Sequence, residues 1–314
     1  MKRSILVAVG LLALGVTAEA QQTKKIFRIG VLQNSTLPPS FLDALKRGLR
    51  EQGYLEEQNT VIVRRGTSKG DAAEMLRQEI DVIVATGTGA VLDAKNATNT
   101  VPIVMSPAAD AIASGLVESL ARPGGNITGL TMITTDLTGK RLELLKETVP
   151  RITHVAAVYP FGATSTAIPT WIKDTEAGAK ALGLKFQTLG LDDNPAAWDG
   201  RFKSVARERG SALIVIENAR LIAERKRLAE LAARHRLPTN FSIKEHVEAG
   251  GLISYGPDLV DVHYRAATYV DKILKGRTPA GRSILRLYLG ISLVGVLGPE
   301  TPTLHAFNPG PWMN

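Results

Sequence analysis

The sequence predicts an α/β protein with two doubly wound lobes, each built on a mainly parallel sheet. Short apolar, β-branched runs alternate with amphipathic helical stretches, and the alternation restarts after Pro150. The runs are apolar almost throughout, which is typical of parallel strands that helices cover on both faces. A chain of 314 residues is also long enough for two lobes with separate hydrophobic cores.

In the first half, we expect five strands with helices between them. The expected strands are Ile26–Leu32, Val61–Val63, Asp81–Ala85, Ile103–Met105 and Ile127–Thr131. The expected helices lie at 40–52, Asp71–Gln78, Ala90–Ala97 and Ala111–Ala121. In the first helix Phe41, Leu45 and Leu49 fall on one face. We expect Ser40 to cap this helix and Gly53 to end it.

In the second half, the same alternation predicts four more strands. The expected strands are Val155–Tyr159, Lys185–Leu189, Ala212–Ile216 and Leu252–Ser254. The expected helices are Gly139–Glu147, Thr166–Leu182, Ala196–Arg209, Leu221–His235 and Leu259–Leu274. Between the halves, the segment Arg122–Asn126 (RPGGN) predicts a sharp, fixed bend, because glycine easily adopts positive φ.

The charge and cysteine content exclude several classes of function. The formal net charge is +8, but basic residues are spread through helical stretches such as 220–236, where Glu224 and Glu230 are interleaved. This pattern is typical of a solvated helix face and argues against nucleic acid as a partner. The chain has no cysteine, which excludes disulfides, thiolate catalysis, cysteine-ligated metals and the lipid anchor of a bacterial lipoprotein.

The first 20 residues predict a cleaved secretory signal peptide. Lys2 and Arg3 precede the apolar run Ile5–Val16, and the small residues Ala18 and Ala20 suit cleavage after Ala20. The run is shorter than the roughly 20 residues that a membrane-spanning helix needs. The alternatives are an uncleaved anchor and a buried first helix. We therefore expect the protein to act outside the cytoplasm.

A ligand site is expected where the carboxyl ends of the strands meet helix N-termini. The strand at Asp81–Ala85 runs into Thr86, Gly87 and Thr88, which suit a carboxylate because two hydroxyls and unpaired backbone N–H groups come together there. The glycine spacing does not match a dinucleotide-binding motif. The alternative is a glycine turn with capping threonines.

Other strand ends supply further candidates. In the first half these are Gln33, Asn34 and Pro107, each of which suits either a cleft wall or an ordinary turn. The equivalent positions of the second half hold Tyr159, Phe161 and Glu217. Glu217 ends an apolar strand, where its carboxylate suits either an ammonium group or a helix N-cap role.

Catalytic and metal-binding motifs are missing from the sequence. It contains no G-x-S-x-G nucleophile elbow, no phosphate-binding P-loop and no H-E-x-x-H. The five histidines show no ligand spacing. We therefore expect neither a cofactor nor a metal, and no catalytic residue is assigned.

Several long motifs resemble a family of bacterial periplasmic substrate-binding proteins of ABC importers, some of whose members bind aromatic amino acids. The motifs are ARPGGNITG (Ala121–Gly129), GKRLELLKE (Gly139–Glu147), RLAELAARHRLP (Arg227–Pro238), EAGGLISYGPDL (Glu248–Leu259) and RAATYVDKILKG (Arg265–Gly276). The resemblance implies a type I periplasmic-binding fold, in which two flavodoxin-like lobes joined by a hinge hold a ligand in the cleft between them.

For this chain, the resemblance implies an N-terminal lobe of residues 26–130 plus 255–279 and a C-terminal lobe of residues 131–254. It implies a monomeric periplasmic receptor, not an enzyme, that passes an amino acid or another small carboxylate to an ABC permease in the inner membrane. The alternatives are an exported α/β enzyme acting on a small metabolite and a ligand sensor for a membrane kinase.

The resemblance stops near Pro279. Residues 280–314 form an atypical tail, in which an apolar, glycine-interrupted segment is followed by a proline-rich end. We therefore hypothesise that the reading frame shifts near Ala280, which predicts that the hinge lacks one of its chain crossings. Resequencing the locus tests this, and an intact conventional frame would remove the hypothesis.

Overall fold

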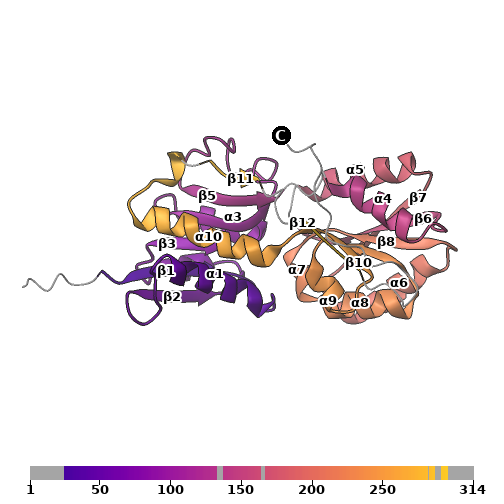
Figure 1. Cartoon of the computed structure of the whole chain (residues 1–314), viewed down its shortest axis with the longest axis horizontal. Coiled ribbons are helices and arrows are strands. Elements are labelled where there is room, and N and C mark those ends of the chain that lie inside the picture. Colours follow the sequence, from indigo (N-terminus) through magenta and orange to yellow (C-terminus); the bar gives the residue numbers. More distant parts are fainter. Residues whose placement is uncertain (1–24, 133–136, 164–166, 282, 287–290, 296–314) are drawn as a thin grey trace, which may run out of the picture.

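Two α/β lobes lie side by side along the molecule (Figure 1). The structure is a computed structural model that describes residues 25–132, 137–163, 167–281, 283–286 and 291–295. Each lobe is built on one six-stranded sheet, with strand orders β11-β5-β4-β3-β1-β2 and β12-β10-β9-β8-β6-β7. We call the lobe that contains β1 the first lobe and the other the second lobe. The predicted fold class is confirmed.

The first lobe takes its strands from both ends of the chain. Its strands are β1 (Phe27–Leu32), β2 (Thr60–Arg65), β3 (Val82–Ala85), β4 (Ile103–Ala109), β5 (Ile127–Met132) and β11 (Leu285–Arg286). Its helices are α1 (Pro39–Glu51), α2 (Asp71–Leu76), α3 (Thr88–Ala97), α10 (Leu259–Leu274) and the short 3-10 helix η3 (Pro279–Gly281). All pairs within this sheet are parallel.

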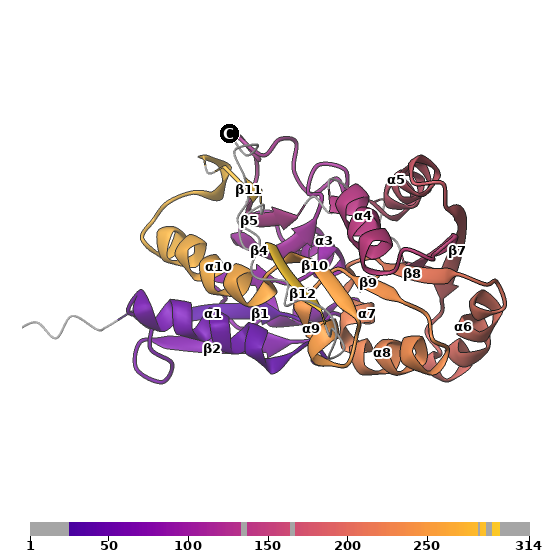
Figure 2. The ribbon, with the colours of Figure 1, turned by 45° about the vertical axis from the view of Figure 1, so that its right-hand side comes forward.

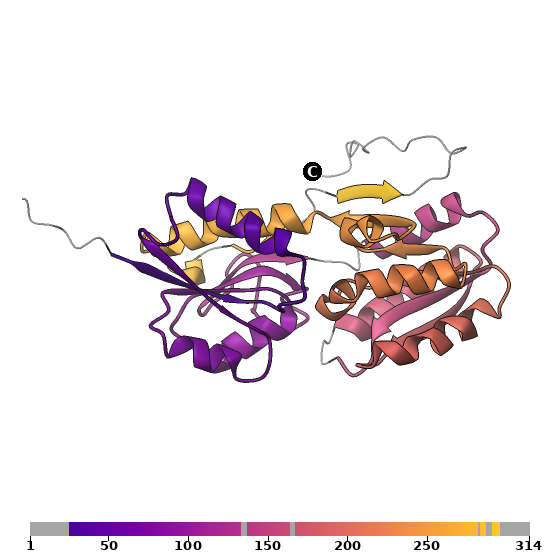
Figure 3. The ribbon, with the colours of Figure 1, turned by 90° about the horizontal axis from the view of Figure 1, so that it is seen from below.

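Helices cover both faces of the first sheet (Figure 3). On one face, α1 and α10 pack against Val82 and Val84 of β3. On the other face, α2 and α3 pack against Ile83 and Ala85 of the same strand. Since successive strand residues point to opposite faces, a strand covered on both sides must be apolar throughout. This is why β3 reads as an uninterrupted apolar run.

The second lobe repeats this architecture. Its strands are β6 (His154–Pro160), β7 (Lys185–Leu191), β8 (Ser211–Val215), β9 (Thr239–Phe241), β10 (Ile253–Pro257) and β12 (Ile291–Gly295). Its helices are α4 (Thr138–Thr148), α5 (Ala167–Ala181), η2 (Pro195–Ala197), α6 (Trp198–Ala206), α7 (Ala219–Ala223), α8 (Arg225–Arg234) and α9 (Lys244–Glu248). Figure 2 shows α4 and α5 on one side of the sheet and α6 and α8 on the other.

The chain passes between the lobes near the cleft. It leaves the first lobe after β5 and returns between β10 and α10, just after the boundary expected at residue 255. Arg141, on α4 just after the first crossing, donates from Nε to the carbonyl of Tyr255, just before the second, at 2.6 Å. The Arg141 side chain is fully buried, so it holds the two crossings together at the hinge.

The described part of the tail contributes one strand to each lobe. β11 pairs with β5 in parallel, and β12 pairs with β10 in antiparallel orientation. Because these two consecutive strands belong to different lobes, the expectation that the hinge lacks one of its chain crossings is wrong. The frame-shift hypothesis itself stays a prediction, and residues 287–290 and 296–314 lie outside the described residues, as does the expected signal peptide at 1–20.

The helix expected at Ala111–Ala121 is wrong, because the segment forms successive turns. The Asp110 carboxylate accepts hydrogen bonds from the backbone N–H groups of Ile112 and Ala113, both at 3.1 Å. Gly115 then adopts a φ of 65°, which ends any helical course. The residue composition of this segment favours a helix. The hydrogen bonds that the Asp110 side chain accepts from the backbone, and the positive φ of Gly115, override that propensity.

Smaller differences follow from local chemistry. Helix α1 begins at Pro39 and has no side-chain cap, so Ser40 is inside the helix and not its N-cap. The helix expected at Leu221–His235 is divided into α7 and α8 at Glu224. The short elements β9 and α9 were not expected. The bend at Arg122–Asn126 is confirmed, since Gly124 and Gly125 have φ values of 74° and 48°.

Gly129 is expected to be among the least replaceable residues of the first lobe. A Cβ built there would lie 2.5 Å from the carbonyl oxygen of Met105, and the φ of Gly129 is 123°. Gly129→Ala should therefore lower the free energy of unfolding by about 2 kcal/mol or more in urea denaturation. Gly139→Ala, on α4 with nothing within 4 Å, is the matched control and should be neutral or slightly stabilising. Equal stability of the two variants would contradict this account of β4 and β5.

Candidate functional site

A cavity of about 440 Å³ lies between the two lobes, where strands of both sheets end. Both lobes supply polar groups to it. The residues that line it are Asn34, Thr67, Thr86, Gly87, Thr88, Gly89, Ala90, Leu92, Pro107, Ala109, Met132, Gly162, Ala163, Ile168, Asp193, Ile216, Glu217, Asn218, Ala219 and Arg220. A cavity of this size is ordinary for a small-molecule site.

The first-lobe wall is formed by the turn between β3 and α3. Gly87 has a φ of 90°, and its N–H donates to the carbonyl of Pro107 at 2.7 Å. This turn places Thr88 at the first residue of α3, where the positive end of the helix faces the cavity. A Cβ at Gly87 would lie 3.8 Å from Ala219 of the second lobe, so the lobes approach each other closely here.

Two groups of the first lobe contact the hydroxyls of the threonines in this turn. The Thr86 hydroxyl oxygen lies 3.3 Å from Nε2 of His263 on α10. The hydroxyl oxygen of Thr88 accepts a hydrogen bond from the backbone N–H of Ala109 at 3.2 Å. Burial lowers the pKa of His263 to about 4, opposed by its hydrogen bond to the backbone of Leu259. The imidazole is therefore neutral at pH 7.

Glu217 supplies the carboxylate of the second-lobe wall. It follows β8, and its Oε2 atom is enclosed without a hydrogen-bond partner among the described residues. Burial raises the pKa of Glu217 to about 7, while the charge of Arg141 opposes the rise and that of Glu245 adds to it. An enclosed carboxylate that lacks a partner is suited to bind a cation or a hydrogen-bond donor from a solute.

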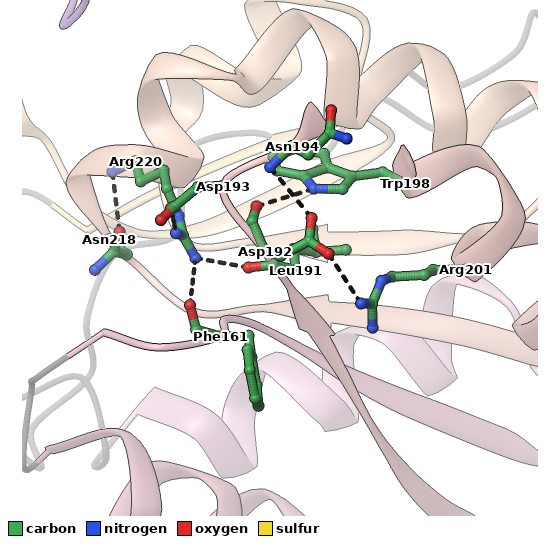
Figure 4. A network of polar contacts seen from close by, with 9 residues as sticks. All are labelled: Phe161, Leu191, Asp192, Asp193, Asn194, Trp198, Arg201, Asn218 and Arg220. Atoms are coloured by element: carbon green, nitrogen blue, oxygen red, sulfur yellow. Dashed lines mark hydrogen bonds and ion pairs between the residues drawn. The ribbon is translucent and has the colours of Figure 1, made fainter. Parts of the chain in front are cut away.

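Arg220 organises the rim of the second-lobe wall (Figure 4). Its Nη2 atom donates to the carbonyls of Phe161 at 3.1 Å and Leu191 at 2.6 Å, and Nη1 forms an ion pair with Asp193. The Asn218 side chain caps α7 by accepting from the Arg220 N–H at 2.9 Å. One guanidinium thus joins the ends of β6 and β7 to α7, which follows Glu217 in the chain.

Apart from the polar residues Asn34 and Thr67, the rest of the lining is apolar. Ile168 and Ile216 come from the second lobe, and Leu92, Pro107 and Met132 from the first. Within the described part of the chain, no aromatic side chain lines the cavity. The arrangement therefore combines a hydroxyl-rich helix terminus, an enclosed carboxylate and an apolar surface, which together suit a small molecule with two polar ends and an apolar part.

The structure brings together most of the residues expected from the sequence. Asn34, Thr86, Gly87, Thr88, Pro107 and Glu217 all line the cavity. Gln33, Tyr159 and Phe161 are not among its lining residues.

The structure places each of these three residues elsewhere. Gln33 continues the β1–β2 pairing through its N–H, which donates to the carbonyl of Arg65. Tyr159 packs against the second-lobe core. The side chain of Phe161 is 60% exposed, and only its carbonyl contributes, by accepting from Arg220.

Asp193 and Arg220 line the cavity but were not expected. Asp193 lies just past the end of β7, so the same strand-end rule that found Glu217 would have found it. Arg220 lies on α7, beyond the strand end, and its role depends on contacts with β6 and β7 that no local pattern reveals.

Among the described residues, no group of three or more His, Cys, Asp or Glu side chains is placed to hold a metal ion. Among the helices in the described ranges, none has both the length and the apolar character needed to cross a membrane.

Comparison with known proteins gives consistent matches. A family model described as ABC transporter substrate binding protein matches residues 39–290. A tyrosine-binding protein of Clostridioides difficile (strain R20291) is 25% identical over 267 residues, which cover 82% of this chain and 75% of that protein.

Solved structures share the fold. An ABC domain from Streptococcus pneumonia in complex with L-Trp has a TM-score of 0.73 at 22% identity, and covers 83% of this chain and 89% of its own. A conserved domain protein from Vibrio cholerae has a TM-score of 0.75 at 24% identity, with 86% and 92% coverage.

Proposed function

We propose that this chain, which belongs to the family of ABC transporter substrate binding proteins, captures a free amino acid in the cavity between its lobes. Membership in the family gives the general function, a solute receptor whose partner is an ABC permease, and the type I periplasmic-binding fold agrees with it. The class of solute and the residues that recognise it are the proposal.

The observation that carries the proposal is the pairing of opposite polar ends in one cavity. The N-terminus of α3, with Thr88, offers donors and a positive field to a carboxylate. Glu217 offers an enclosed carboxylate without a partner among the described residues, which suits an ammonium group. The aliphatic lining between them suits a side chain. The relatives that bind tyrosine or L-Trp support the same class of solute.

Closing the lobes around the solute supplies part of the binding energy. Water leaves the cavity as the lobes approach, and each charged contact strengthens in the lower dielectric. A dissociation constant near 1 μM, about −8 kcal/mol, would be ordinary for such a site. The site residues in this proposal are Asn34, Thr86, Gly87, Thr88, Pro107 and Glu217, with Arg220 as the residue that positions the rim.

ABC substrate-binding proteins act outside the cytoplasmic membrane. We propose that this chain reaches the periplasm through a signal peptide cleaved after Ala20, and that it acts there as a monomer. Sequencing the N-terminus of the exported protein tests the cleavage site, and a mature chain that still begins at Met1 would contradict it.

A receptor returns its solute unchanged, whereas the alternative, an exported enzyme, converts it. The family is one of solute-binding proteins, and we propose that this chain has no catalytic activity. Incubating the protein with a bound amino acid and analysing the solution by mass spectrometry decides between the two. Turnover that scales with protein concentration would favour the enzyme.

A thermal-shift screen tests the class of solute. The protein, refolded free of carried-over ligand, is mixed with the 20 L-amino acids, and L-tyrosine is the first probe. A ligand at 100 times its dissociation constant stabilises the native state by about 2.7 kcal/mol, which raises the Tm by roughly 4 °C for a chain of this size.

The control for each amino acid that binds is its analogue without the amino group. We expect the analogue to give a much smaller shift, because Glu217 then lacks a cation. A sugar or nucleoside that stabilises the protein while no amino acid does would contradict the proposal.

A further inference from the structure

A buried histidine fixes the direction of a hydrogen bond at the wall of the cavity. His263 lies on α10 and is 1% exposed. Its Nδ1 atom lies 2.7 Å from the carbonyl oxygen of Leu259, and its Nε2 atom lies 3.3 Å from the Thr86 hydroxyl. A carbonyl oxygen can only accept a hydrogen bond, so the Nδ1 atom must carry a proton.

The state of the second ring nitrogen follows from burial. The ring is enclosed and stacks on Phe41, with 4.6 Å between the ring centroids and an interplanar angle of 16°. Burial lowers the pKa of His263 to about 4, so the ring carries one proton at pH 7. Nε2 therefore holds a lone pair and can only accept. The Thr86 hydroxyl donates its single proton to this nitrogen, which leaves the Thr86 oxygen only lone pairs for a solute.

The Thr88 hydroxyl has the opposite role, since it is available as a hydrogen-bond donor. Its hydroxyl oxygen already accepts from the backbone N–H of Ala109 at 3.2 Å. The Thr88 hydroxyl proton has no acceptor among the described residues, so it is available to an acceptor in the cavity that Thr88 lines. Two threonines on one turn thus present different groups, an acceptor at Thr86 and a donor at Thr88.

We infer that Thr86 and Thr88 recognise opposite ends of the solute, with Thr86 accepting from its ammonium group and Thr88 donating to its carboxylate. His263 acts as the positioning residue that sets this order through the Thr86 hydroxyl. The inference rests on the proposed function, since it assumes that the solute is an amino acid. It differs from the expectation that both threonines bind the carboxylate.

The tautomer of His263 is measured directly in the ligand-free full chain. The protein is labelled with ¹⁵N-histidine, and long-range ¹H–¹⁵N spectra at pH 7 report which ring nitrogens carry protons. The His263 signals are assigned by their loss in His263→Gln. We expect a proton on Nδ1 and none on Nε2. A proton on Nε2, or a doubly protonated ring, would overturn the inference whatever the solute is.

Binding to three probes tests the polarity of the two threonines. L-Tyrosine has both charged groups, 3-(4-hydroxyphenyl)propanoate lacks the ammonium group and tyramine lacks the carboxylate. Thr86→Val should weaken L-tyrosine and tyramine by about tenfold or more and leave the propanoate within about twofold. Thr88→Val should weaken L-tyrosine and the propanoate and leave tyramine unchanged. Thr86→Ser, which keeps a hydroxyl, should recover most of the affinity that Thr86→Val loses.

The outcomes separate this inference from the proposed function. If Thr86→Val weakens the propanoate as much as it weakens L-tyrosine, Thr86 binds the carboxylate and the inference is overturned. If wild-type protein binds none of the 20 amino acids, the proposed function fails, and the histidine spectra still decide whether Thr86 is an acceptor.

Discussion

Replacing Thr86 and Thr88 together by valine is expected to weaken the binding of an L-amino acid by at least tenfold. Valine keeps the shape of threonine but removes the hydroxyl, so the solute loses one partner for each of its charged groups. A hydrogen bond to a charged group contributes about 1.5–3 kcal/mol, and one such bond already corresponds to about tenfold in affinity. Isothermal titration with the amino acid found in the thermal-shift screen measures the effect.

The fold should survive this double substitution. Thr86→Val leaves Nε2 of His263 without its donor, which costs about 1–3 kcal/mol of stability and is visible in the Tm. Thr100→Val, on an exposed loop of the same lobe, is the control and should leave both affinity and Tm unchanged. An unchanged binding isotherm in the folded double variant would remove the β3–α3 turn from the site.

The affinity for an amino acid is expected to fall about tenfold between pH 8 and pH 6. In the ligand-free protein the pKa of Glu217 is raised to about 7, so the side chain is mainly ionised at pH 8 and mainly protonated at pH 6. An ammonium group binds the ionised form, and binding at the lower pH must first release the proton. The solute keeps its ammonium group throughout this range, so the change belongs to the protein.

Two variants identify the group that titrates. Glu217→Gln should bind more weakly at pH 8 and should show a nearly flat profile between pH 6 and 8. Glu245→Gln removes a neighbouring charge that raises the pKa of Glu217, so its profile should keep its shape and move to lower pH. Titration calorimetry in buffers of different ionisation enthalpy should also show proton release on binding near pH 7. A pH-dependent profile that persists in Glu217→Gln would assign the titration to another group.

The architecture could be predicted from the sequence because strands covered on both faces must be apolar. β3 is an example, since all four of its residues are buried and none interrupts the pattern. Helix α10 was predicted with its observed bounds, because its apolar positions repeat at helical spacing and Gly276 follows it. The helix predicted at 111–121 is wrong because Asp110 and Gly115 determine the path of this segment, and the average helix propensity of the segment does not reveal the effect of either residue.

The sequence could predict those site residues that directly follow a strand. Thr88 and Glu217 follow strands of different sheets, and the carboxyl ends of parallel strands in two facing lobes open into one cleft. The local sequence pattern does not show whether a side chain at a strand end points into the cavity. Tyr159 lies near the end of β6 and Phe161 follows that strand, but Tyr159 packs on the core and Phe161 is exposed to solvent.

Long-range contacts explain the remaining differences. The polarity of Thr86 depends on His263, which is 177 residues away along the chain. The position of the loops at the cavity rim depends on Arg220, which donates hydrogen bonds to carbonyls at the ends of β6 and β7. Neither contact follows from residue type or spacing, because each depends on how complete elements pack in three dimensions.

The central claim is that one small zwitterion is held in the cavity between the two lobes, with its carboxylate on the first lobe and its ammonium group between Glu217 of the second lobe and Thr86. A crystal structure of the protein with the amino acid found in the screen tests this most directly. We predict electron density in the cavity, with the carboxylate within hydrogen-bond distance of Thr88 and the ammonium group near Glu217 and Thr86. Density for the amino acid on the surface of a single lobe, with this cavity holding only water, would contradict the account.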